Sequence, residues 1–93
     1  MTYTEDQKAL ISSLLGTKIA PRTKSPSLRQ SLVAANERMH AGSLTESDLL
    51  LIGSALELLV TMTPENGSKE EWTALVEALT VTRGMLAQAE SDG

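Results

Sequence analysis

The sequence predicts an all-α fold, a small four-helix domain whose last two helices form an antiparallel hairpin. Apolar residues recur at helical spacing, capping residues precede each apolar stripe, and no stretch alternates as a half-buried strand does. The predicted helices span residues 5–15, 26–41, 46–62 and 69–89. We expect residues 1–90 to form one domain and residues 91–93 to be a disordered tail.

The first predicted helix begins after Thr4, which stands three residues before Gln7 as in a capping box. Gly16 is placed to end this helix in the left-handed conformation. The apolar face of the helix consists of Leu10, Ile11, Leu14 and Leu15.

Residues 17–25 are predicted to form a basic connector in which Ile19 reaches into the core. The second helix begins at Ser25-Pro26, because proline at the first helical position lacks an N–H that has no partner there. Gly42 is expected to end it. The apolar face of this helix consists of Leu28, Leu32, Ala35 and Met39, with Val33 beside them.

The third predicted helix is capped by Thr45, and Asp48 stands where a capping box has its acidic partner. From Leu49 to Met62 the residues are apolar on nearly all sides, so this helix is expected to be the most buried. It is either the central helix of the fold or part of an oligomer interface. Gly53 and Ser54 are small enough to let another helix approach closely.

The fourth helix is predicted to follow a turn at residues 64–67, with Ser68 as its N-cap and Glu71 completing a capping box. Its expected buried stripe consists of Trp72, Leu75, Val76, Leu79 and Leu86, with Met85 alongside.

The residue inventory disfavours several classes of function. The chain has no Cys, one His and two aromatic residues, so thiol chemistry is excluded and stacking of nucleic-acid bases is disfavoured. We expect no enzyme activity and no cofactor, because the sequence lacks a recognisable set of convergent catalytic groups. No signal peptide or membrane span is predicted, and the absence of Cys favours a cytoplasmic setting.

Glu37 and His40 have the i, i+3 spacing that carboxylate-bridged metal sites in helical bundles use. Such sites need two copies of the motif and further carboxylates, whereas this chain has one copy. His40 is also placed to meet the free carbonyl groups at the end of its helix. We therefore predict no metal site.

Charge is unevenly distributed along the chain. Residues 17–40 contain five basic residues and one acidic residue, whereas residues 41–93 contain two basic and nine acidic residues. The basic residues are candidates for binding a partner, and they are Lys18, Arg22, Lys24, Arg29 and Arg38.

These observations favour a non-catalytic protein–protein interaction or regulatory module that associates with itself as a homodimer or with another protein. The candidate oligomer interface on the third helix consists of Leu50, Leu51, Leu58 and Met62. The alternative is a nucleic-acid-associated factor that contacts phosphates through the basic segment at residues 18–29. Base-edge readout is disfavoured, because the third helix has no Arg, Lys, Asn or Gln.

Overall fold

The computed structural model describes residues 2–62 and 69–92, and these residues form four α-helices with no strand. The elements in chain order are α1 (Glu5–Leu14), η1 (Leu15–Ile19), η2 (Ala20–Arg22), α2 (Pro26–Ala41), α3 (Glu46–Met62) and α4 (Lys69–Asp92). Helix α2 and helix α3 have the predicted bounds. The predicted all-α class is confirmed.

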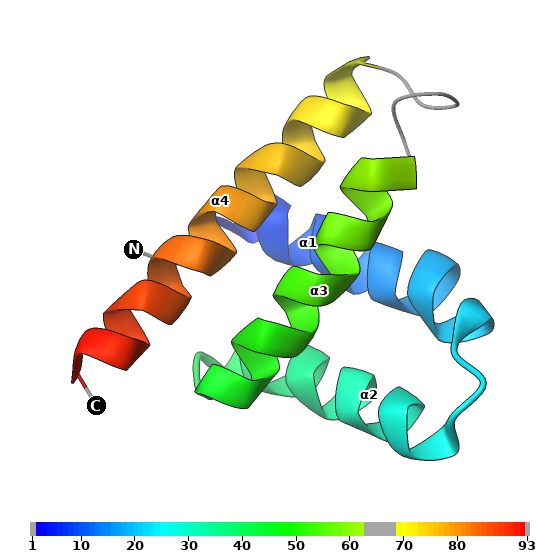
Figure 1. Ribbon diagram of the computed structural model, residues 1–93, viewed down its shortest axis with the longest axis horizontal. Coiled ribbons are helices and arrows are strands. Elements are labelled where there is room, and N and C mark those ends of the chain that lie inside the picture. The colour runs from blue at the N-terminus through cyan, green and yellow to red at the C-terminus, as the bar shows by residue number, and fades with distance from the viewer. Residues whose placement is uncertain (1, 63–68, 93) are drawn as a thin grey trace.

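Helices α3 and α4 pack side by side in opposite directions (Figure 1). Helix α1 passes behind them, and α2 lies near the N-terminal end of α3. The predicted helical hairpin is therefore confirmed. The turn predicted at residues 64–67 and the predicted N-cap Ser68 lie outside the described residues.

Local side-chain contacts explain where the helices begin. The Thr4 hydroxyl accepts the Gln7 N–H at 3.1 Å, and the Gln7 side chain accepts the Thr4 N–H at 2.9 Å. Thr45 and Asp48 form the same reciprocal pair at the start of α3, with distances of 3.2 and 3.0 Å. These two of the three predicted capping boxes are confirmed, and Asp48 serves where Glu is more usual. The third, Ser68 with Glu71, includes a residue outside the described ranges.

The prediction that Gly16 ends the first helix in the left-handed conformation is wrong. Among the described residues, positive φ occurs at Gly42, where it is 75°, and not at Gly16. At Gly16 the helix widens into the π-helix η1 and continues, which carries Ile19 into the core. The predicted connector at residues 17–25 is thus helical as far as Arg22.

Helix α3 contributes more buried residues than any other helix in the described ranges, as predicted. Its Ile52 and Leu56 are almost completely enclosed, together with Ile11 of α1, Met39 of α2 and Leu75 of α4. The side chains of all four helices therefore meet in one aliphatic core.

Three apolar residues are more exposed than their predicted stripes imply. Leu28 lies in the first turn of α2, Val33 lies at the edge of the α2 stripe, and Trp72 lies near the start of α4. At the C-terminal end, α4 reaches Asp92, so Ser91 and Asp92 are helical where a disordered tail was expected. Gly93 lies outside the described residues.

Candidate functional site

The five basic candidate residues do not form one free cationic surface. Lys18 of η1 forms an ion pair with Glu71 of α4 at 2.9 Å. Arg38, near the end of α2, forms an ion pair with Asp48 of α3. Two of the five positive charges are therefore matched by carboxylates of the same chain.

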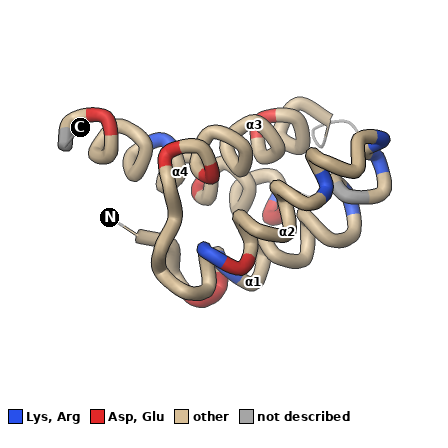
Figure 2. Tube along the Cα trace, turned by 90° about the horizontal axis from the view of Figure 1, so that it is seen from below, with Lys and Arg blue, Asp and Glu red and all other residues tan. Residues whose placement is uncertain are grey.

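The other three basic residues are exposed and have no acidic partner among the described residues. Arg22 instead places Nη1 at 3.0 Å from the Met62 sulfur atom of α3. Lys24 precedes α2 and Arg29 lies in its first turns. Figure 2 shows basic positions gathered toward one end of the molecule, around η1, η2 and the start of α2.

The Arg38–Asp48 pair links α2 and α3, with the Asp48 carboxylate buried and the Arg38 side chain 41% exposed. Arg38 donates from Nε and Nη2 to the two carboxylate oxygens of Asp48, at 2.5 and 2.6 Å. These hydrogen bonds, helped by those from Thr45, lower the pKa of Asp48 to about 2 although burial opposes the shift. Arg38 thus stabilises the fold, a role that the charge count alone does not indicate.

The four candidate interface residues of α3 lie on two different sides of that helix. Leu50 is 51% exposed and borders a groove between α3 and α4. A different side of α3 from that of Leu50 presents three residues at spacings of seven and four: Leu51, Leu58 and Met62. Leu58 is 50% exposed and Met62 39% exposed, whereas Leu51 is partly buried against the core.

With Ala55, these residues form a stripe with the 4-3-4 spacing of a coiled-coil seam. We call Leu51, Ala55, Leu58 and Met62 the α3 stripe. Ala55 is nearly buried, so the accessible apolar surface of the stripe is concentrated at Leu58 and Met62. The stripe is thus better exposed toward the C-terminal end of α3.

The groove between α3 and α4 has a volume of about 220 Å³ and is lined by residues of both helices. Arg83 of α4 donates to Glu57 of α3 across it. A Cβ built on Gly53 would lie 3.5 Å from the Thr82 methyl group. The close helix approach expected at Gly53 therefore occurs within the chain, between α3 and α4.

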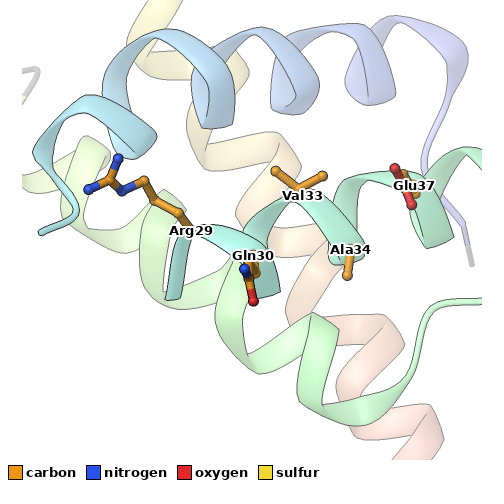
Figure 3. Close-up of a pocket in the computed structure, with 5 residues that line it drawn as sticks. All are labelled: Arg29, Gln30, Val33, Ala34 and Glu37. Atoms are coloured by element: carbon orange, nitrogen blue, oxygen red, sulfur yellow. The ribbon is translucent and has the colours of Figure 1, made fainter. Parts of the chain in front are cut away.

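The outer face of α2 has a shallow depression of about 360 Å³ that is lined by this helix alone. Figure 3 shows Arg29 and Val33 extending on the side of α2 that faces α1, whereas Gln30 and Ala34 point the other way. Because one helix supplies every lining residue, this face does not enclose a ligand. Sequence reasoning placed Val33 beside the core and so missed its exposure.

Glu37 and His40, the spacing considered for metal binding, are both exposed on α2. No cluster of three or more potential metal-ligating residues occurs within residues 2–62 and 69–92. In the same ranges, no helix combines the length and apolar character that crossing a membrane requires.

Tyr3 is the one tyrosine of the chain, and it is buried against α4. Its hydroxyl shares a hydrogen bond with Thr82, which also donates to the Ala78 carbonyl at 2.8 Å. Burial raises the pKa of Tyr3, and the hydrogen bond to Thr82 offsets part of that rise. This contact fastens the segment before α1 to α4.

Comparisons with protein-family models, with curated proteins and with solved structures found no match to this chain.

Proposed function

We propose that this chain is a non-catalytic protein–protein interaction module that forms a two-fold dimer through the α3 stripe. The observation that carries the proposal is the half-exposed Leu58 on a stripe with coiled-coil spacing. A second copy of α3 packed against this stripe removes Leu58 and Met62 from water in both protomers. Burial of this apolar surface is the driving force for association.

The proposed dimer is of modest affinity. Stable interfaces bury about 1,200–2,000 Å² in total, and one helix stripe with two well-exposed residues supplies only part of such an area. We therefore expect dissociation in the micromolar range, which suits a module whose partner exchange is regulated. A micromolar dimer also accounts for the isolated chain keeping a complete core of its own.

Sedimentation equilibrium across a range of concentrations tests the proposal. The unaltered chain is expected to dimerise at high micromolar concentration, and Leu58→Glu is expected to be monomeric with an unchanged unfolding midpoint. Thr80→Glu is the matched control, because it adds the same charge at an exposed position of α4 outside the stripe. A monomeric unaltered chain at high micromolar concentration contradicts the proposal.

The proposed setting of this module is the cytoplasm. A chain without Cys has no disulfide to form, and small secreted domains are commonly disulfide-rich. Cell fractionation with an antibody against the folded chain tests this placement, and recovery in the extracellular fraction contradicts it.

A further inference from the structure

Sulfur in this chain is confined to methionine, since the sequence has four Met and no Cys. The thioether is therefore the sulfur group that a mild oxidant meets. Met62, the last residue of α3, is 39% exposed, whereas Met39 of α2 is 1% exposed. Met85 of α4 is partly buried against the core. Met62 is thus the most accessible of the methionines at positions 39, 62 and 85.

The Met62 sulfur has a cationic neighbour. Nη1 of the exposed Arg22, in η2, lies 3.0 Å from this sulfur atom. A thioether is a weak hydrogen-bond acceptor, so the contact is weak while Met62 is reduced. An oxygen atom bound to the sulfur accepts much better from a cation. Oxidation of Met62 therefore strengthens its contact with Arg22.

Met62 is also one of the two well-exposed residues of the α3 stripe, so the inference below rests on the proposed dimer. A two-fold dimer through this stripe takes Met62 of both protomers out of water. A sulfoxide at this position is polar and loses its hydrogen bonds to water when the second copy covers it. One oxidation in each protomer thus opposes association twice.

We propose that Met62 is a site of oxidation by peroxides to methionine sulfoxide, and that this oxidation keeps the chain monomeric. A lone pair of the sulfur forms the S–O bond as the O–O bond of hydrogen peroxide breaks. The sulfur loses two electrons, and the departing oxygen takes both protons of the peroxide and leaves as water. Arg22 then donates to the sulfoxide oxygen and holds it beside η2.

Peptide mapping by mass spectrometry tests the site of oxidation. The full chain is treated with dilute hydrogen peroxide at a protein concentration well below the dissociation constant of the dimer. Met62 is expected to gain one oxygen atom at least about tenfold faster than Met39, because peroxide reaches only the exposed sulfur. Equal rates at these two residues would overturn the proposal.

Sedimentation equilibrium tests the effect of oxidation on the dimer. The chain oxidised at Met62 is expected to have a dissociation constant about tenfold higher than the untreated chain. Met62→Leu is the matched control, because leucine keeps a similar apolar volume and has no sulfur. This variant is expected to dimerise and to be unaffected by peroxide. Met62→Gln is expected to weaken the dimer without any oxidant.

The part played by Arg22 is tested by the same ratio of dissociation constants, measured with and without peroxide. Arg22→Ala is expected to reduce the effect of peroxide, because the sulfoxide is then no longer held beside η2. Lys24→Ala removes a nearby exposed cation and is expected to leave the full effect. An equal effect in both variants would contradict the role of Arg22.

Two further results overturn the proposal. One is an unchanged dissociation constant for a chain that is fully oxidised at Met62, and the other is equal weakening of Met62→Leu by peroxide. A chain that is monomeric before any treatment contradicts the proposed dimer itself. Failure of the dimer is therefore distinguishable from failure of the oxidation of Met62 to control it.

Discussion

Arg38 and Asp48 lock the end of α2 to the start of α3 through two parallel hydrogen bonds of 2.5 and 2.6 Å. Asp48 also accepts the Thr45 N–H, so one buried carboxylate both caps α3 and fixes the turn around Gly42. The geometry is the bidentate pairing that distinguishes Arg from Lys.

Asp48→Asn is expected to lower the free energy of unfolding by about 2 kcal/mol at neutral pH. The physical reason is that the pairing holds the pKa of Asp48 at about 2 instead of its ordinary 3.8. Asn retains an oxygen for the Thr45 N–H, so the helix cap survives. Urea unfolding at pH 7 measures the difference.

The Arg38–Asp48 pair also makes the free energy of unfolding depend on pH between about 4 and 2. Because the pKa of Asp48 is lowered in the folded chain, its contribution is complete above about pH 4 and is lost as the pH falls to about 2. The gap between the unaltered chain and Asp48→Asn should therefore shrink across that window. A gap of constant size from pH 7 to pH 2 would contradict this assignment.

Gly42→Ala and Gly16→Ala are expected to change stability in opposite directions. Gly42 has a φ of 75°, where a Cβ is strained, so alanine there costs about 1–2 kcal/mol. Gly16 is helical and has open space around it, so alanine there gains about 0.5–1 kcal/mol. Urea midpoints at constant m-value decide the signs, and destabilisation by Gly16→Ala would contradict its helical placement.

The contrast between these two glycines shows how far the sequence carries the fold. The starts of α2 and α3 follow from nearby residues. Ser25 precedes α2 and Pro26 is its first residue, and Thr45 before α3 pairs with Asp48 inside it. Gly16 has the same local appearance as Gly42, yet packing of Ile19 into the core lets the helix continue. A cap signal therefore predicts a helix end only where tertiary contacts agree.

The candidate sites were harder to predict, because they depend on which side of a helix meets another. Leu50 and Leu51 are adjacent in sequence, but Leu50 borders α4 and Leu51 belongs to the stripe. Arg38 belongs to the basic region by charge count, but its guanidinium pairs with Asp48. The contact between Arg22 and the Met62 sulfur has no signature in the sequence at all.

Tyr3→Phe is expected to cost about 1 kcal/mol, the worth of one hydrogen bond, because the ring still fills its site. The Tyr3→Phe variant is also expected to lack the fall in the free energy of unfolding that ionisation of Tyr3 causes at high pH. Burial raises the pKa of Tyr3, so the unaltered chain loses stability as the pH rises above 10 and Tyr3 ionises.

Absorbance of tyrosinate measures this titration directly, since the chain has one Tyr. The folded chain should titrate at higher pH than the urea-unfolded chain. Identical titration curves in the two states would show that Tyr3 is not buried.

The basic residues are expected to bind nucleic acid weakly or not at all at about 50 mM salt, since Lys18 and Arg38 are matched within the chain. Fluorescence anisotropy with labelled duplex and single-stranded DNA and RNA provides the measurement. Tight, salt-sensitive binding that is lost in the Lys24→Glu/Arg29→Glu double variant would instead support the phosphate-contacting alternative.

The contact between Tyr3 and Thr82 joins residues that are 79 positions apart. At a synthesis rate of about 5–20 residues per second, Tyr3 is made several seconds before Thr82. During that interval α4 is not yet there to receive Tyr3. The Tyr3 side chain therefore lacks its native partner on the nascent chain. Tyr3 thus acquires its native contact only after the whole intervening sequence, including most of α4, has been synthesised.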